Sequence, residues 1–343
     1  MKLPNNLPMP TDISKAEIID LLLREEYGYL PPAPKSVKVE RETIDNKFCA
    51  GKAPLETLRL TCTLDGGEFS FPVYYVCPKD RAKTLPCFVM INFRDSVPDR
   101  YLPSEEIVDA GHAVLSFCYK DVSSDDADFT NGLAGIVYPD GARGKSDCGK
   151  IGLWAWAAIR VLEYALTLPE LDHAHISVAG HSRLGKTALL AGALDERFYC
   201  AFSNDSGCSG ASIARGSDGE TIRKICDRFP YWFCEEYYKY ADREDEMPFD
   251  QHYLLSANYP HRVYVASAEA DAWACPRNEY LSCVAASEYY EKHGKRGLVS
   301  SVDEPKAGDF FGEGYIGYHI RSGAHYFSRE DWKRYIEYLS KCE

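Results

Sequence analysis

Residues 178–198, VAGHSRLGKTALLAGALDERF, form a pattern of an apolar strand, a sharp turn that holds Ser182, and an amphipathic helix. A serine at such a strand–turn–helix junction lifts its hydroxyl above the sheet, beside the N–H groups that open the helix. The usual spacing of this nucleophile elbow is G-x-S-x-G, whereas Gly180 and Gly185 give G-x-S-x-x-G here. Gly185 still falls on the first helical turn, where close packing on the strand favours a residue without Cβ. The stretch therefore predicts an elbow, and the simpler alternative is that Ser182 only caps the helix.

The pattern of the surrounding sequence predicts the layers of the fold. Continuous apolar runs alternate with helical segments: the runs are 85–93, 112–119, 175–180, 200–207 and 262–270, and the helices are 151–168, 184–194 and 278–294. Fully apolar strands between helices indicate a parallel sheet that is covered on both faces. Two earlier runs, 55–64 and 69–78, flank the turn Asp65-Gly66-Gly67 and predict an antiparallel hairpin. This order predicts an α/β-hydrolase, a three-layer sandwich with a mostly parallel central sheet and an N-terminal antiparallel hairpin.

Two long segments do not follow the alternation. The segment near 120–150 is polar and rich in Gly and Asp, and the segment near 207–258 is aromatic and partly helical. Insertions at the carboxyl edge of a parallel sheet usually build the substrate pocket. Residues 1–35 predict an N-terminal arm with one short helix. We expect a single domain over 1–343 with these two segments as pocket-forming insertions.

The composition restricts the kind of partner that the protein binds. The formal net charge is −13 with a pI of about 5.2, which argues against a nucleic-acid partner because phosphate binding needs a basic surface. Mean hydropathy is −0.34 and no apolar run approaches a membrane span, so we expect no membrane association. The 13 cysteines form no C-x-x-C pair or Cys/His ladder, and we expect no metal and no cofactor. Together with an N-terminus that lacks a signal-peptide pattern, they predict reduced thiols and a cytoplasmic protein.

A nucleophilic serine needs a base, and in this fold the order along the chain is serine, acid, histidine. His319 and His325 lie in the segment GYHIRSGAHYFSREDWKRYIEYL, which predicts a loop before the last helix. We expect His325 to be the base, with His319 as a structural residue or a substrate contact.

Two aspartates compete for the place of the acid. Asp205 ends the strand after the elbow helix, and Asp271 ends the next strand, which is the usual location in this fold. Either carboxylate could reach the imidazole, the two could share the role, and each could instead cap a loop.

Taken together, these motifs resemble carbohydrate esterase family 15, the glucuronoyl esterases. The elbow 180–186, GHSRLGK, matches the family pattern G-x-S-R-x-G-K. Further similarity lies in SNDSGCSGASIAR (203–215), ASAEADAWACP (266–276) and HIRSGAHYFSREDW (319–332). The resemblance runs from about residue 85 to 335. The loop RDSVPDR (94–100) departs from the Gly-rich form of the family.

The resemblance implies roles for particular side chains. It implies a catalytic set of Ser182, His325, Asp205, Asp271 and Arg183, in which the arginine stabilises the developing oxyanion. It implies a uronate pocket lined by Lys186, Glu220 and Trp273. Lys186 lies one helical turn from Ser182, where it would face the same mouth and bond a sugar hydroxyl; the alternative is an exposed helix lysine. Trp273 would stack on a sugar face, and its alternative is core packing.

The implied function is a serine esterase that hydrolyses esters of glucuronic or 4-O-methyl-glucuronic acid through an acyl-enzyme, in the degradation of hemicellulose and its lignin esters. The partner would be a small-molecule or oligosaccharide uronate ester. One alternative is an acetyl-xylan or other carbohydrate acyl esterase on the same triad. A third is a non-catalytic sugar-binding relative, which the complete set of serine, histidine and acids disfavours.

Overall fold

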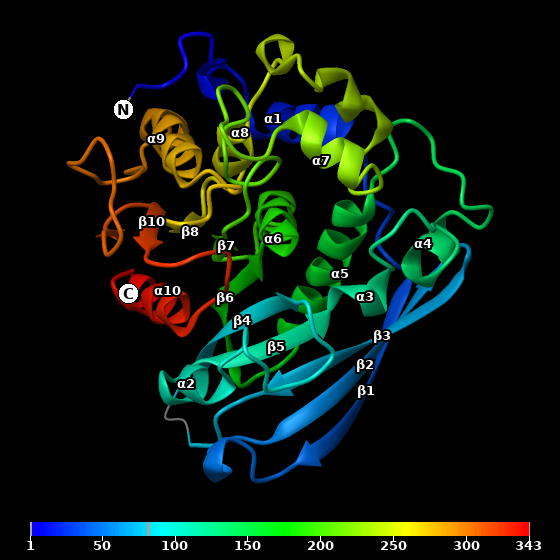
Figure 1. The fold of residues 1–343 in the computed structure, drawn as a ribbon. Helices are drawn as coiled ribbons and strands as arrows, with labels where there is room; N and C mark the ends of the chain where they lie inside the picture. The colour runs from blue at the N-terminus through cyan, green and yellow to red at the C-terminus, as the bar shows by residue number, and fades with distance from the viewer. Residues whose placement is uncertain (1, 81–82, 343) are drawn as a thin grey trace.

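One ten-stranded sheet runs through the computed structural model, which describes residues 2–80 and 83–342 (Figure 1). In chain order its strands are β1 (Ser36–Asp45), β2 (Leu55–Leu64), β3 (Gly67–Val76), β4 (Leu85–Asn92), β5 (Ala113–Cys118), β6 (Leu171–His181), β7 (Cys200–Asn204), β8 (Arg262–Ala268), β9 (Phe310–Phe311) and β10 (Ile316–Arg321). In space their order is β1-β2-β3-β5-β4-β6-β7-β8-β10-β9. In this spatial order the neighbouring strands β5, β4, β6, β7, β8 and β10 pair parallel. The strands β1, β2, β3 and β9 pair antiparallel with their neighbours.

Helices cover both faces of this sheet (Figure 1). In the described part of the chain they are α1 (Lys15–Leu22), α2 (Ser104–Asp109), α3 (Tyr119–Val122), α4 (Gly132–Val137), α5 (Lys150–Ala165), α6 (Arg183–Leu194), α7 (Ile222–Arg228), α8 (His252–Ser256), α9 (Pro276–Lys292) and α10 (Arg329–Ser340). One core lies between the sheet and α1, α5, α6, α8 and α9, and a second core lies between the sheet and α2 and α10. None of the helices described is long and apolar enough to cross a bilayer.

The continuous apolar runs are explained by these two cores. In β4, Val89 belongs to the first core and its neighbours Phe88 and Met90 belong to the second. Since successive side chains of a strand point to opposite faces, every position of such a strand is buried. The predicted three-layer fold is confirmed, and the predicted hairpin is β2 and β3, which joins the parallel part where β3 pairs antiparallel with β5.

Three strands were absent from the predicted set: β1, the two-residue β9, and β10. β1 is an edge strand whose side chains are mostly exposed and charged, so it shows neither an apolar run nor alternation. β10 is buried along its whole length and lies within the segment expected to be a loop before the last helix. His319 is therefore a strand residue, whereas His325 lies in the loop that follows.

The N-terminal arm forms hydrogen bonds with the second insertion, residues 207–258. After α1, a π-helical turn at Leu23–Tyr27 ends at Gly28, which has a φ of +80°. The buried Tyr27 donates its hydroxyl to the carbonyl of Ser209 at 2.9 Å, and the carbonyl of Glu26 accepts the N–H of Cys234 at 2.9 Å. These bonds hold the start and the middle of the 207–258 segment.

Candidate active site

Ser182 occupies a strained turn between β6 and α6. Its φ of 59° and ψ of −129° are an unfavourable conformation for a residue with a Cβ, and such strain is typical of a nucleophile elbow. Its side chain makes no capping hydrogen bond to the helix, so the simpler alternative of a serine cap does not describe this residue. The backbone carbonyl of Ser182 instead accepts the N–H groups of Gly185 and Lys186 at 2.8 and 3.2 Å.

The two glycines make this close turn possible. A Cβ on Gly180 would lie 2.0 Å from the carbonyl oxygen of Leu184, which is backbone of the elbow itself. A Cβ on Gly185 would lie 2.9 Å from Ser203 Oγ and 3.1 Å from Ser206 Cβ, on the neighbouring β7 and its loop. The later glycine therefore serves the contact between the helix and the sheet, which explains why a one-residue shift is compatible with the elbow.

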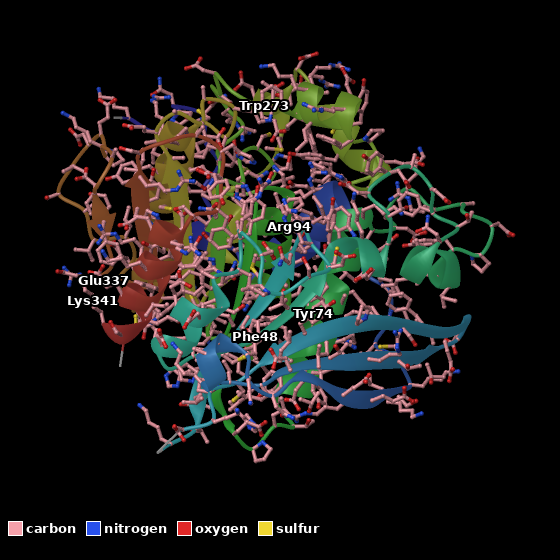
Figure 2. The ribbon with its side chains drawn as sticks, turned by 60° about the horizontal axis from the view of Figure 1, so that its bottom comes forward. Phe48, Tyr74, Arg94, Trp273, Glu337 and Lys341 are labelled. Atoms are coloured by element: carbon pink, nitrogen blue, oxygen red, sulfur yellow. The ribbon has the colours of Figure 1, made fainter. Side chains whose placement is uncertain are left out.

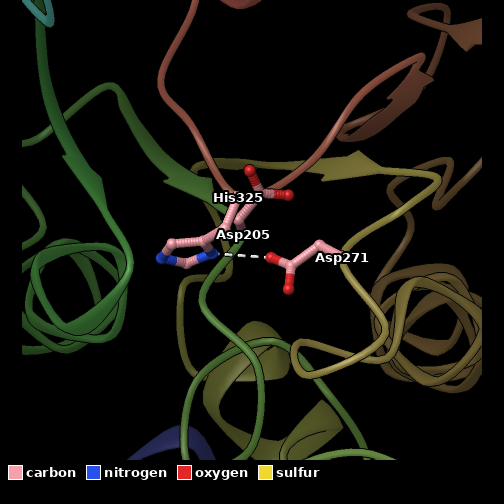
Figure 3. Close-up of side chains that lie close together, drawn as sticks. All are labelled: Asp205, Asp271 and His325. Atoms are coloured by element: carbon pink, nitrogen blue, oxygen red, sulfur yellow. Dashed lines mark hydrogen bonds and ion pairs between the residues drawn. The ribbon is translucent and has the colours of Figure 1, made fainter.

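His325 and Asp271 form a hydrogen-bonded pair at the carboxyl edge of the sheet (Figure 3). The distance from His325 Nδ1 to Asp271 Oδ2 is 2.6 Å. The histidine side chain is 42% exposed, whereas that of the aspartate is 4% exposed. The imidazole is thus oriented from its buried side, and its Nε2 has no hydrogen-bond partner in the part of the chain that the structure describes.

Asp205 lies close to this pair but bonds elsewhere. It is 1% exposed, and its Oδ2 accepts a hydrogen bond from Arg321 Nη2 at 3.2 Å. Burial, together with the charges of Glu279 and Asp331, holds the pKa of Asp205 well above its usual value. The ligand atoms of Asp205, Asp271 and His325 lie within 4.8 Å of one another, a spacing that a metal ion could also use. Here Asp271 Oδ2 bonds the imidazole and Asp205 Oδ2 bonds a guanidinium, whereas Asp205 Oδ1 has no hydrogen-bond partner among the described residues.

His319 is built into the core. Its Nε2 lies 3.0 Å from Asp331 Oδ1, and its Nδ1 lies 2.9 Å from the hydroxyl of Tyr264. Both ring nitrogens therefore have protein partners, and the residue is 2% exposed. Of the two histidines in this segment, only His325 lines the cleft with Ser182.

His181, next to the serine, packs against His325. Their ring centroids are 4.5 Å apart, and His181 Nδ1 lies 2.6 Å from Asn204 Oδ1. Burial, with a contribution from the charge of His325, lowers the pKa of His181 to about 3. His181 therefore stays neutral at ordinary pH and adds no repulsion when His325 accepts a proton.

The guanidinium of Arg183 is held beside the elbow by both insertions. It forms an ion pair with Asp125 and stacks 4.5 Å from the ring centre of Trp232. Asp125 is itself held by Trp232 Nε1 at 2.8 Å and by the hydroxyl of Tyr119 at 2.9 Å. The Nε of Arg183 is buried and has no hydrogen-bond partner. The site therefore holds a fixed cation beside the elbow.

Lys186, Glu220 and Trp273 form one connected group. The buried amine of Lys186 donates to the carbonyls of Ser206, at 2.5 Å, and Cys208, and lies 3.2 Å from Glu220 Oε2. Its three donors thus have protein acceptors, so it is not an exposed helix lysine, and its bond to a sugar hydroxyl stays a prediction. Glu220 Oε1 accepts the Nε1–H of Trp273 at 2.9 Å. The indole is 44% exposed and lies at the surface beside the second insertion (Figure 2), which is not core packing.

A cleft of about 340 Å³ joins all of these parts. Its lining residues are Ser182, Arg183, Lys186, Asp205, Ser206, Gly207, Glu220, Arg228, Phe229, Trp232, Asp271, Trp273, Ala274 and His325. The second insertion supplies the far wall, while the first supplies Asp125 behind Arg183 and none of these lining residues.

Sequence reasoning missed Arg228, Phe229, Trp232 and Asp125. The available signal was the aromatic stretch DRFPYWF (227–233), which gave no spacing from which to choose a residue. Asp125 lies 58 positions before Arg183, and only the fold brings the two together.

Comparison with known proteins agrees with this geometry. The family described as glucuronyl esterase, fungi, matches residues 60–294. A carbohydrate esterase from an unknown prokaryotic organism is 38% identical over 237 residues, 68% of this chain and 54% of that protein. A 4-O-methyl-glucuronoyl methylesterase from Schizophyllum commune is 27% identical over 293 residues, 82% of this chain and 68% of that protein.

The fold is also that of a solved glucuronoyl esterase from Solibacter usitatus, with a TM-score of 0.87 and 28% identity over 99% of this chain and 98% of that one. The chain spans about half the length of the first of the curated relatives, at 54%. The family match covers more than half of the present chain and includes the elbow, Asp205 and Asp271. The chain belongs to the glucuronoyl esterases of carbohydrate esterase family 15.

Proposed function

We propose that this protein is a serine esterase that hydrolyses esters of glucuronic or 4-O-methyl-glucuronic acid through an acyl-enzyme. The observation that carries the proposal is that Ser182, on its strained elbow, shares one cleft with the hydrogen-bonded pair His325–Asp271. The family and the name of the Schizophyllum commune relative, a 4-O-methyl-glucuronoyl methylesterase, support the choice of substrate.

The proposed reaction follows from the free atoms of the site. Asp271 holds Nδ1–H of His325, so that Nε2 faces outward as the base. As Ser182 Oγ attacks the ester carbonyl, His325 takes the hydroxyl proton and then gives it to the departing alcohol. Water, activated by the same imidazole, cleaves the resulting acyl-enzyme and releases the uronic acid.

Arg183 is the proposed oxyanion donor. Charge develops on the carbonyl oxygen during both steps, and a donor that is already fixed there stabilises it without reorganisation. Asp125 and the stacked Trp232 fix the guanidinium, and the side chain, which is 22% exposed, lines the cleft with Ser182. The backbone N–H of Arg183, at the start of α6, is a second donor at the same place.

The sugar is proposed to lie on the acyl side, against Glu220 and Trp273. The carboxylate of Glu220 can accept from sugar hydroxyls, and the half-exposed indole offers a flat apolar face. The amine of Lys186 holds the carboxylate of Glu220, and this carboxylate accepts the indole N–H of Trp273. The proposed sugar-binding surface beside Ser182 is therefore held in place by hydrogen bonds, and both of its charged groups are fixed.

Hydrolysis of benzyl glucuronate, 4-nitrophenyl acetate and acetylated xylan by the wild type and Ser182→Ala tests the proposal. We expect a preference for the uronate ester in kcat/KM, with loss of activity in Ser182→Ala. Ser340→Ala on α10, far along the chain from the elbow, is the control and should retain full activity. Preference for the acetyl substrates would keep the triad and overturn the uronate pocket, and full activity of Ser182→Ala would overturn the mechanism.

A further inference from the structure

Arg321, the last residue of β10, has its guanidinium buried beneath the loop that carries His325. The residue is 8% exposed. Its Nη1 donates to the carbonyls of Ser322 and Ala324, at 3.1 and 3.3 Å. Its Nη2 donates to Ala324, at 3.3 Å, and to the carbonyl of Tyr326. The guanidinium therefore binds the peptide groups on both sides of His325.

The same guanidinium is anchored to two other parts of the chain. Its Nε lies 3.0 and 2.9 Å from the two carboxylate oxygens of Asp331, in the first turn of α10. Asp331 also caps that helix through Ser328 and accepts from His319, and these partners with Arg321 keep its pKa below its usual value although burial opposes this. The third anchor is Asp205, at 3.2 Å.

The backbone of the same loop also holds the loop of the acid. The carbonyl of Arg321 accepts the N–H of Glu269 at 2.9 Å, and the carbonyl of Gly323 accepts the N–H of Ala270 at 2.9 Å. These donors immediately precede Asp271. The position of His325 relative to Asp271 thus depends on a loop in which three carbonyls bond the side chain of Arg321 and one bonds the loop of the acid.

We propose that Arg321 is the positioning residue of the catalytic histidine, and that the buried Asp205 anchors its guanidinium as a hydrogen-bond acceptor. The inference rests on the proposed esterase function. An arginine suits this place because its planar fork has five N–H donors in fixed directions, whereas a lysine has one small cationic group. A misplacement of about 1 Å at a catalytic group can cost on the order of a hundredfold in rate.

The first test is Arg321→Lys, which keeps the charge but cannot reach the three carbonyls and Asp331 together. We expect kcat for benzyl glucuronate to fall about ten- to a hundredfold with KM changed less than about threefold, since Glu220 and Trp273 are untouched. The NMR resonance of the proton between His325 Nδ1 and Asp271, assigned by its loss in Asp271→Asn, should broaden or disappear.

Arg215→Lys is the matched control. Arg215 is 3% exposed and likewise joins a buried carboxylate, Asp250 at 3.0 Å, to backbone carbonyls, here those of Phe249 at 2.7 Å and Met247. It does not line the cleft. We expect it to lower the thermal midpoint while kcat and the NMR resonance are unchanged.

A second pair of variants tests the loop without replacing a buried side chain. Gly323 and Gly308 are both exposed and share a φ of +103°, so alanine strains the backbone equally at either place. A Cβ at Gly323 would lie 3.3 Å from Arg321 Nη1, whereas a Cβ at Gly308 has nothing within 4 Å. Gly323→Ala should lower kcat and perturb the NMR resonance, and Gly308→Ala should do neither.

The outcomes separate this proposal from the proposed function. If the wild type does not hydrolyse uronate esters, the function fails, and the NMR resonance still reports on Arg321. If the wild type is active and folded Arg321→Lys keeps its kcat and resonance, the positioning role is overturned. Should Arg321→Lys not fold, equal behaviour of Gly323→Ala and Gly308→Ala would overturn it instead.

Discussion

His325 and Asp271 meet across two adjacent parallel strands, because the loops after β10 and β8 bring Nδ1 and Oδ2 to 2.6 Å. Asp205 follows β7, the next strand of the sheet, yet its carboxylate bonds Arg321 and not the imidazole. Two buried acids of the same site thus differ in what they hold. Asp271 bonds the ring of His325, and Asp205 bonds Arg321 beneath the loop that carries His325.

Substitution of each acid by asparagine should therefore give unequal losses. We expect Asp271→Asn to lower kcat about 10³- to 10⁴-fold, because the imidazole loses its orienting partner. Asp205→Asn should cost about tenfold or less, through Arg321. Steady-state kinetics on benzyl glucuronate measure both, with the double variant showing whether the effects combine. Equal losses would mean that the two carboxylates share the role of the acid.

Trp273→Ala should weaken substrate binding with little effect on stability. The indole is 44% exposed, so its removal leaves a small cavity, but it takes away the stacking face of the proposed sugar site. We expect KM for benzyl glucuronate to rise about tenfold and the thermal midpoint to stay within about 2 °C. Tyr238→Ala, an equally exposed aromatic away from the cleft, is the control. An unchanged KM would remove Trp273 from the sugar site.

The two elbow glycines should respond differently to alanine. At Gly180 the added Cβ meets the carbonyl oxygen of Leu184 at 2.0 Å, and backbone of the elbow cannot move aside cheaply. We expect a loss of about 3 kcal/mol or more in the free energy of unfolding. At Gly185 the nearest atom is the hydroxyl of Ser203, which can rotate, so the loss should be about 1 kcal/mol. Urea unfolding compares the two variants, and a larger loss at Gly185 would contradict this account.

The stability of the protein should fall as pH rises through neutrality. Burial raises the pKa of Glu26 from 4.5 to about 8, and that of Glu279 to about 7. Between the unfolded and folded values, the folded protein holds more protons than the unfolded chain, so the free energy of unfolding decreases with pH. Thermal midpoints from about pH 6.5 to about pH 8 should show this decrease; below that range the lowered pKa of His181 acts in the opposite direction.

Glu26→Gln should make this pH dependence shallower, because the amide stays neutral in its place beside Gln251. Glu304→Gln, an exposed carboxylate, should leave it unchanged. Identical slopes in the wild type and Glu26→Gln would show that Glu26 ionises in the folded protein at no cost.

Local patterns were sufficient for the apolar strands β4 to β8 and for the elbow, but not for the buried β10, whose run is interrupted by His319 and Arg321. The run of β4 and the glycines around Ser182 carry their signal within a few residues of sequence. β1 could not be predicted this way, since an exposed edge strand has no core to impose a pattern. The domain organisation of the whole chain and its cellular location stay predictions.

The contacts that decide the site lie far apart in sequence. Arg321 lies 116 positions from Asp205, and no pattern near Asp205 distinguishes it from Asp271. Similarly, Lys186 faces the cleft as its helical position suggested, but the loop carbonyls of Ser206 and Cys208 take up its amine. Sequence motifs thus indicated which residues gather at the carboxyl edge of the sheet. Their hydrogen-bond partners could not be predicted, because those partners lie far away in the sequence.

Arg183 is gripped by Asp125 from one insertion and by Trp232 from the other, and these two side chains also bond each other at 2.8 Å. In a chimera of two members of this family, Asp125, Arg183 and Trp232 should therefore come from the same parent. Grafting the 207–258 segment of a relative without its 120–150 segment would leave the carboxylate of Asp125 or the indole at position 232 without its hydrogen-bond partner beside the reacting carbonyl. Libraries that diversify the two segments together should retain active members more often than libraries that diversify either one alone.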